Sequence, residues 1–219
     1  MKTHPLAMSL VIVLLIAISA GCSTPAPQMS AVDRSFVTGK PCTAPCWYGL
    51  ELDKAKQETV LTTVRGLEFV DQSSIRVYDN SVWPQFPTAS EVYFCSKSEK
   101  HTCNTAVLSE GELKMLWLSV EYDLTLSEAV QRLGEPDYIS YSSYSPEARS
   151  CRFVLYWPKD HIFVENVNAT DDGICQTLKS GKGVKANTKA TGLVYAVSEV
   201  FTGLELRSWH TSWPGFAER

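Results

Sequence analysis

The segment Leu124–Pro136 (LTLSEAVQRLGEP) constrains the fold most, because it encodes the start, the buried side and the end of one helix. Thr125 can cap the N-terminus, and Glu128 three residues later completes a capping box. Gly134 suits a left-handed C-cap, and Pro136 prevents the helix from continuing. The apolar residues fall at helical spacing and predict one buried stripe, formed by Leu126, Ala129, Val130 and Leu133.

An earlier stretch, Trp47–Val70, has a similar but looser organisation. Asp53 can cap a helix with Gly66 near its end, and its inner side would hold Val60, Leu61, Val64 and Leu67. Strand-like runs follow each helix: Glu91–Ser96, Thr105–Leu108 and Glu112–Tyr122 after the first, and Cys151–Trp157, His161–Glu165 and Leu193–Phe201 after the second. The sequence therefore predicts an α+β fold of two tandem helix-plus-antiparallel-strands units, packed as one or two small layers. Trp117 and Trp157 lie inside these runs, so we expect them in the core.

The N-terminus has the features of an export signal. Lys2 supplies a positive charge, and the apolar run Leu6–Ile18 is shorter than the roughly 20 residues of a membrane-spanning helix. The run ends in Ser19-Ala20-Gly21-Cys22, which resembles the lipobox of bacterial lipoproteins. In that family a cysteine at this position is lipidated on sulfur before cleavage and then acylated on its new N-terminus. The resemblance implies lipidation at Cys22; an ordinarily secreted protein or a simple membrane anchor is the alternative.

These patterns divide the sequence into four parts: a signal peptide (1–21), a flexible tether (22–40), a first α+β unit (41–122) and a second one (123–219). The tether is predicted because residues 23–39 contain few large apolar side chains and include the run Thr24-Pro25-Ala26-Pro27-Gln28. A lipid on the N-terminus would hold the body at a membrane. We therefore expect an extracytoplasmic, lipid-anchored protein at the cell membrane or the outer membrane.

Six cysteines remain besides Cys22: Cys42, Cys46, Cys95, Cys103, Cys151 and Cys175. An even number of cysteines behind an export signal is typical of disulfide bonds formed in an oxidising compartment. Proximity in the sequence favours the pairs Cys42–Cys46, Cys95–Cys103 and Cys151–Cys175, although other connectivities are possible. A thioredoxin-like site would have the spacing C-x-x-C after a strand, so a structural role for the first pair is favoured over a redox role.

The remaining motifs support no metal, cofactor or catalytic site. His101 with Cys95 and Cys103 lacks a fourth zinc ligand at the usual spacing. Asn168–Gly173 imitates the start of a calcium loop, but Lys179 occupies the position of the bidentate glutamate. The G-x-S-x-G, H-E-x-x-H, P-loop and Rossmann fingerprints are missing from the sequence, so we predict that the protein is not an enzyme. The net charge of −4 gives no electrostatic reason to expect nucleic-acid binding.

The short helix ending in LGEP at Leu124–Asp137, followed by strands, resembles the small outer-membrane-assembly lipoproteins of the SmpA/OmlA type. It also resembles the tandem-repeat beta-lactamase inhibitor proteins, and Gly49–Val70 is a looser echo of the same module. Pro41–Trp47 is similar to the PC-x-x-PCW opening of other bacterial lipoproteins. The resemblance implies an α+β body that binds proteins through a sheet face and performs no chemistry.

The predicted function is therefore that of a non-catalytic cell-envelope lipoprotein, bound to the membrane by its lipid and to an unknown envelope protein by its body. The alternative is an exported enzyme or thiol-redox protein whose site is not visible in the sequence. Exposed aromatic side chains clustered on a sheet face would favour the first. A deep pocket with convergent polar groups, or a reactive thiol, would favour the second.

Overall fold

The computed structural model describes residues 32–81, 83, 85–98, 102–143, 150–170, 177–178, 180–205 and 210–217. The helices are α2 (Ser35–Thr38), α3 (Gln57–Gly66), α4 (Leu126–Leu133) and α6 (Ser198–Glu205), with a 3₁₀ turn η1 (Pro158–Asp160). The strands are β1 (Val70–Ser81), β2 (Ala89–Ser96), β3 (Cys103–Ser109), β4 (Glu112–Ser119), β5 (Tyr138–Ser143), β6 (Ser150–Trp157), β7 (Ile162–Thr170), β8 (Gly192–Ala196) and β9 (His210–Ser212). Within this part of the protein, no helix is long and apolar enough to cross a membrane.

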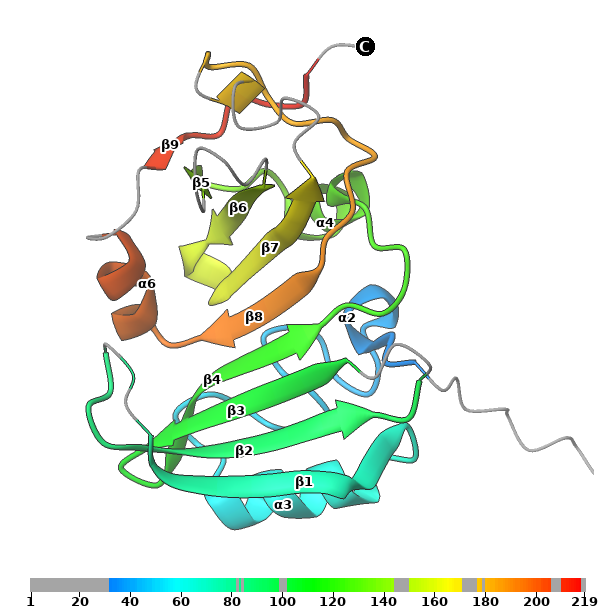
Figure 1. The fold of residues 1–219 in the computed structure, drawn as a ribbon, viewed down its shortest axis with the longest axis vertical. Helices are drawn as coiled ribbons and strands as arrows, with labels where there is room; N and C mark the ends of the chain where they lie inside the picture. Colours follow the sequence, from blue (N-terminus) through cyan, green and yellow to red (C-terminus); the bar gives the residue numbers. More distant parts are fainter. Residues whose placement is uncertain are drawn as a thin grey trace, which may run out of the picture.

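The strands form one continuous antiparallel sheet of nine strands, in the order β1-β2-β3-β4-β8-β7-β6-β5-β9 (Figure 1). The sets β1–β4 and β5–β8 each follow a helix in the sequence, and they meet where β4 pairs with β8, from Met115↔Ala196 to Ser119↔Gly192. The prediction of tandem α+β units in one or two small layers is therefore wrong, because the fold is a single large sheet with few short helices. The two sets of strands join because β4 is apolar on both faces. Pairing with β8 removes the otherwise exposed edge of β4 from water.

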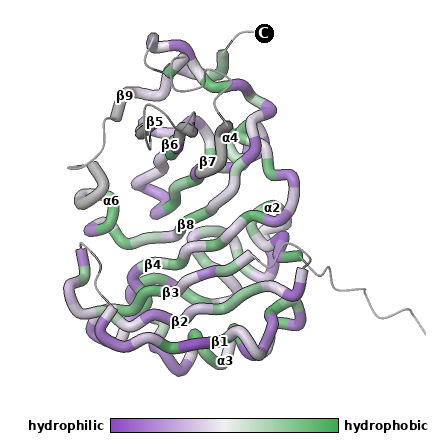
Figure 2. Tube along the Cα trace, in the orientation of Figure 1, coloured by the Kyte–Doolittle hydropathy of each residue, from purple (hydrophilic) through white to green (hydrophobic). Residues whose placement is uncertain are grey.

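Both faces of the sheet bury apolar side chains. On one side, which we call the helix face, Trp47, Val60, Leu116 and Leu155 belong to a core that α2, α3, α4 and the loop before α3 cover. The other side, which we call the open face, carries Tyr93, Trp117 and Phe163. Part of it is covered by α6 and by the segment after β1, through Val200, Phe201 and Phe86. Strand β1 is hydrophilic over much of its length, as expected at the edge of a sheet (Figure 2).

Helix α4 begins as its sequence specifies, but Gly134 at its C-terminus has φ 81° and ψ −174°, so the prediction of a left-handed cap is wrong. Thr125 and Glu128 form the capping box, with the Thr125 hydroxyl accepting from the Glu128 N–H at 3.2 Å, so this prediction is confirmed. Leu126 and Ala129 are completely buried, whereas Val130 and Leu133 are only partly buried. The helix therefore lies against the sheet on its first turn more closely than on its last.

Two local predictions are wrong. Asp53 does not cap α3, because the helix begins at Gln57 after Lys56; Asp53 has φ 58° and pairs with Lys114 at 2.6 Å. The apolar run Leu193–Phe201 is not one strand, because β8 ends at Ala196 and α6 begins at Ser198. The Val197 N–H bonds to the Lys114 carbonyl at 3.0 Å just before the backbone turns back over the sheet.

Residues 32–39, which we call the N-terminal strap, pack on the helix face. Phe36 is 4% exposed, and the Asp33 carboxylate accepts hydrogen bonds from Trp47 Nε1 at 2.6 Å and Tyr48 Oη at 3.3 Å. Burial and the nearby negative charge of Asp33 raise the pKa of the Tyr48 phenol. From α4, Arg132 donates to the Val37 carbonyl at 2.8 Å. The strap therefore joins the loop before α3 to helix α4.

Candidate binding face

A row of cross-strand neighbours runs over the open face. It comprises Arg76, Tyr93, Thr105, Trp117, Val194, Phe163, Tyr156 and Tyr138, on β1, β2, β3, β4, β8, β7, β6 and β5. Phe163 and Tyr156 are buried, because Phe201 from α6 contacts both rings. Tyr93 and Trp117 are only partly buried. The sheet is thus covered over β6 and β7, and Val107 and Met115 are also buried on β3 and β4, whereas Tyr93, Thr105 and Trp117 are partly accessible.

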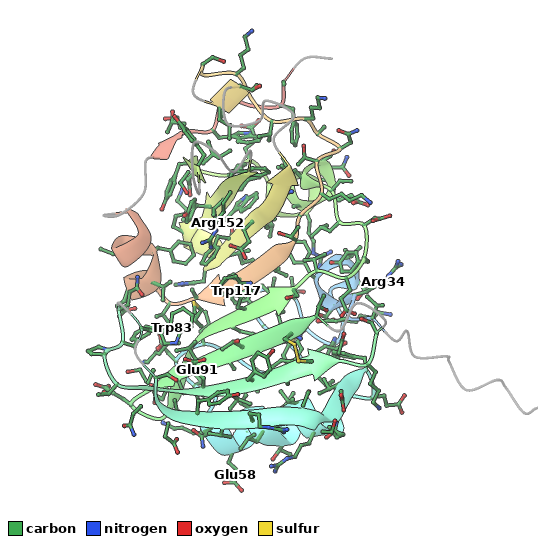
Figure 3. All side chains as sticks on the ribbon, viewed as in Figure 1. Arg34, Glu58, Trp83, Glu91, Trp117 and Arg152 are labelled. Atoms are coloured by element: carbon green, nitrogen blue, oxygen red, sulfur yellow. A yellow bond between two sulfur atoms is a disulfide. The ribbon has the colours of Figure 1, made fainter. Side chains whose placement is uncertain are left out.

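Aromatic side chains gather on this accessible part. Tyr78 is 50% exposed, and its ring centroid lies 6.4 Å from that of Tyr93. Trp83, in the segment after β1, donates its indole N–H to Glu91 at 2.8 Å. Figure 3 shows Trp83, Glu91 and Trp117 on the same side of the sheet. Together these residues form an amphipathic surface, apolar over the rings and polar at the tips, of the kind that aromatic residues form at interfaces.

An ion pair lies next to Trp117. Arg152 on β6 donates from Nη2 to Glu165 Oε2 at 2.6 Å, and its guanidinium carbon lies 5.9 Å from the Trp117 ring centroid. The Glu165 side chain is 1% exposed and that of Arg152 is 30% exposed. Burial raises the pKa of the Glu165 carboxyl, and the positive charge of Arg152 opposes that rise. The Glu165 carboxylate is therefore buried in the sheet, and the Arg152 guanidinium lies between it and solvent.

Gly192 makes room for this buried acid. A Cβ at Gly192 would lie 2.5 Å from Glu165 Oε1 and 2.7 Å from its Cγ, which no real packing tolerates. Among the described residues, Oε1 has no hydrogen-bond partner. The side chain of Glu165 therefore occupies the space that a side chain at position 192 would fill.

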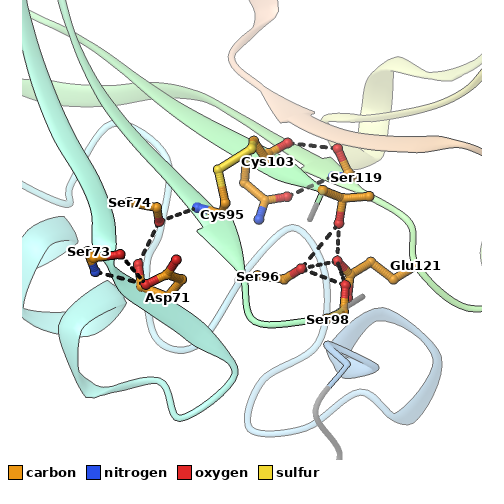
Figure 4. Close-up of a disulfide and its surroundings, with 11 residues drawn as sticks. Asp71, Ser73, Ser74, Cys95, Ser96, Ser98, Cys103, Ser119 and Glu121 are labelled. Atoms are coloured by element: carbon orange, nitrogen blue, oxygen red, sulfur yellow. Dashed lines mark hydrogen bonds between the residues drawn. A yellow bond between two sulfur atoms is a disulfide. The ribbon is translucent and has the colours of Figure 1, made fainter. Parts of the chain in front are cut away.

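The disulfide-distance pair Cys95 and Cys103 borders the accessible surface. The two residues are directly opposite each other on β2 and β3, with sulfurs 2.09 Å apart (Figure 4). The Ser119 hydroxyl donates to the Cys103 carbonyl at 2.7 Å, which ties this hairpin to β4. Beside it, the Glu121 carboxylate accepts hydrogen bonds from the hydroxyls of Ser96, Ser98 and Thr102. The border of the face is thus fixed by side-chain bonds as well as by the strand ladder.

The other predicted site residues are placed as follows. Cys42 and Cys46 lie at disulfide distance, with sulfurs 2.19 Å apart, in the loop before α3. Cys151 is on β6, but Cys175 and Cys22 lie outside the described residues, as does His101. The third disulfide and the lipidation of Cys22 therefore stay predictions. In the described ranges, no group of three or more His, Cys, Asp or Glu side chains is arranged to hold a metal ion.

A small cavity of about 260 Å³ lies between the loop before α3 and the turn after η1. It is lined by Pro45, Cys46, Glu51, Leu52, Asp53, Lys54, His161 and Val197. Its charged groups already have partners, because Lys54 pairs with Glu51 at 2.6 Å and Lys114 with Asp53 at 2.6 Å. The cavity is below the roughly 300–1,000 Å³ of typical small-molecule sites. The open face is therefore the better candidate.

Sequence reasoning missed Arg152, Glu165 and Gly192, and it placed Trp117 wholly in the core. The available signal was a charged residue within each of two apolar strands, Arg152 in CRFVLYW and Glu165 in HIFVE. Charged residues in such positions are rare unless they are paired. The expectation for Trp157 is met, since its side chain is 2% exposed.

Comparison with known proteins gives no relative for this protein: no family model, curated protein or solved structure matches it.

Proposed function

We propose that this is a non-catalytic, lipid-anchored protein of the cell envelope that binds a protein partner through the open face. The observation that carries this proposal is the group of exposed and partly exposed aromatic side chains on this face: Tyr78 on β1, Tyr93 on β2 and Trp117 on β4. Tyrosine, tryptophan and arginine dominate the energetics of protein interfaces, and Arg152 adds the third of these residue types.

The location of the protein rests on its N-terminus. The export-signal pattern and the lipobox-like Ser19-Ala20-Gly21-Cys22 support a lipid anchor at Cys22, at the cell membrane or the outer membrane. The likeness of Leu124–Asp137 to the SmpA/OmlA-type lipoproteins and to the beta-lactamase inhibitor proteins supports protein binding without chemistry. The partner would be another protein of the same envelope.

The size of the face limits the interaction. Strand β2 has 8 residues, which gives a length of about 26 Å, and four strands span about 19 Å. The outline of the four strands is therefore on the order of 500 Å², and part of it is buried at Val107 and Met115, whereas a standard interface covers about 800 Å² on each partner. A partner that binds here with high affinity must also contact the segment after β1 or the β2–β3 hairpin.

A site-specific photocrosslinker tests the proposal. The full-length protein, carrying p-benzoylphenylalanine in place of Tyr93, would be produced in cells of the native host and irradiated. We expect one discrete crosslinked protein, and we expect it to be lost when Trp117→Ala is added. The matched control places the same crosslinker at Glu58, which is exposed on α3 and points away from the sheet (Figure 3). Equal products from both positions, or a product that survives Trp117→Ala, would refute the proposal.

A further inference from the structure

The two sulfurs of the predicted Cys42–Cys46 disulfide have different surroundings. Both cysteines are only partly buried. The Gly49 N–H donates to Cys42 Sγ at 3.4 Å. Cys46 instead lines the cavity of about 260 Å³ between the loop before α3 and the turn after η1, and Cys42 is not among the residues that line it. A reagent in the cavity therefore meets Cys46, whereas negative charge that develops on the sulfur of Cys42 is stabilised by a backbone donor.

His161 supplies a base to the same cavity. It lies at the end of η1 with φ 58°, and its Nδ1 is 3.2 Å from the Ala196 carbonyl oxygen. A carbonyl oxygen only accepts hydrogen bonds, so Nδ1 carries the proton and Nε2 is the acceptor of the ring. A neutral imidazole in this tautomer can remove the proton of a thiol that enters the cavity.

The size and charge of the cavity limit which thiol can enter. A volume of about 260 Å³ is below that of typical ligand sites but accommodates a molecule of the size of cysteine. The exposed residues of its lining carry both signs of charge, at Glu51, Asp53 and Lys54. The side chains of the Glu51–Lys54 ion pair are 53% and 74% exposed, so this pair is weak and can yield to the ammonium and carboxylate of a zwitterion. The reagent that fits is a small zwitterionic thiol.

We propose that Cys46 is a site of S-thiolation by a low-molecular-weight thiol of the size of cysteine. His161 Nε2 takes the proton of the entering thiol, and the thiolate attacks Cys46 Sγ. A new S–S bond forms between the small thiol and Cys46, the Cys42–Cys46 bond breaks, and Cys42 leaves as a thiolate that accepts from the Gly49 N–H. The proton then passes from His161 to this thiolate through solvent. One disulfide is exchanged for another without net oxidation, in a stoichiometric reaction that does not depend on the open face.

The loop keeps its place when this bond opens. Trp47, next to Cys46, is 1% exposed, and its indole N–H donates to Asp33 at 2.6 Å. The backbone N–H and carbonyl of Trp47 also pair with Leu50 at 3.1 and 2.9 Å. These contacts hold the loop on the helix face independently of the disulfide. We therefore expect the thiolated protein, and variants at the cavity, to stay folded.

Peptide mapping by mass spectrometry tests the site. The full-length protein in detergent would be incubated with free cysteine and quenched in acid that contains N-ethylmaleimide. We expect cysteine attached to Cys46 and maleimide on Cys42 in the same molecules. Cys95 and Cys103 are the internal control, because paired strands hold them opposite each other and return a released sulfur to its partner. Free thiols at Cys42 and Cys46 before treatment, an intact bond after it, the adduct on Cys42, or equal opening of both pairs would overturn the proposal.

The role of His161 is read from the pH dependence of the reaction. About 3% of a thiol with a pKa of about 8.5 is ionised at pH 7, so a base in the cavity can accelerate the attack by at most about 30-fold. His161→Asn, which tolerates a positive φ, should lower the rate about 10-fold at about pH 7 and change it little at about pH 9.5. Lys159→Gln, at an exposed residue of η1 outside the cavity, is the matched control and should keep the rate. Equal rates for His161→Asn and the unchanged protein at both pH values, or an equal loss at both, would overturn the role of His161.

The entry route has a separate test. After correction for the ionised fraction of each thiol, glutathione should react more slowly than cysteine, because the cavity of about 260 Å³ excludes the larger molecule. Equal corrected rates would show that the attack does not come through the cavity and would overturn the assignment of a small thiol. Thermal unfolding curves of the variants show that a changed rate does not come from a changed fold.

Discussion

Replacing Gly192 by alanine should destabilise the protein far more than one methyl group normally does. The new Cβ would lie 2.5 Å from Glu165 Oε1 and 2.7 Å from its Cγ, so the acid must move. Overpacking a dense interior costs about 1–3 kcal/mol. Because Glu165 binds Arg152 at 2.6 Å and is 1% exposed, a displaced carboxylate also loses its partner, and breaking such a buried pair costs about 3–5 kcal/mol. Because the Arg152 side chain is 30% exposed and can follow a displaced carboxylate, the two costs do not add in full, and we expect Gly192→Ala to lower the free energy of unfolding by about 3 kcal/mol.

Equilibrium unfolding in urea would measure this loss. With an m-value of about 2 kcal/mol/M, the midpoint should fall by about 1.5 M. Gly66→Ala is the matched control, because Gly66 ends α3 and no atom beyond its own helix backbone and chain neighbours lies within 4 Å of the position that its new Cβ would take; this variant should be more stable by about 0.4–1 kcal/mol. In a Glu165→Ala background, Gly192→Ala should cost little, since the clash is gone. A midpoint shift of less than about 0.3 M for Gly192→Ala alone would refute the packing described for Glu165.

Three further predictions concern α4 and the N-terminus. Leu126→Ala should lower the free energy of unfolding in urea by about 2–5 kcal/mol, because Leu126 is fully buried. Leu133→Ala should lower it clearly less, because Leu133 is only partly buried, and equal losses would contradict this packing. Hydrogen bonds from the backbone and hydroxyl of Thr125 lower the pKa of Glu128, so its carboxylate stabilises the fold above the ordinary pKa and the benefit is lost as the pH falls through the lowered one. Glu128→Gln should therefore lower the melting temperature at about pH 7 and make little difference at about pH 3. Cys22→Ser should abolish incorporation of labelled fatty acid and partitioning into detergent; persistence of both would exclude lipidation at Cys22.

The parts of the fold that were predictable are local in the sequence. The capping box of α4 is formed by Thr125 and Glu128, three residues apart, and its buried stripe begins at Leu126. Neither feature depends on what the helix packs against. The single sheet was not predictable in this way, because Met115 and Ala196 belong to strands far apart in the sequence. Nothing in either apolar run indicates which other strand completes its edge.

The candidate site shows the same limit. Arg152 and Glu165 could be recognised as unusual charges in apolar strands, but their contact depends on an irregular register between β6 and β7. The register shift between Cys151 and Phe153 is part of the pairing geometry, which the alternation of residues does not reveal. Trp117 was expected in the core because it lies in an apolar run. Its partial exposure results from the placement of α6 farther along the sheet, over Tyr156 and Phe163.

The pairing of β4 with β8 has a consequence for any attempt to divide the protein. The half before Val120 contributes β4 and the half after Asp123 contributes β8, and each of these strands pairs with the inner edge of the other half. Cutting the backbone between Val120 and Asp123 would therefore leave one apolar strand on each half with unpaired backbone groups. Separately produced halves should then either recombine with each other or form symmetric dimers through the bared strand. The strap supplies the preference for the correct combination, because Asp33 binds Trp47 in one half while Val37 accepts from Arg132 in the other. The protein is thus suited to fragment complementation, in which residues 32–39 favour association of the two different halves over self-association of either one.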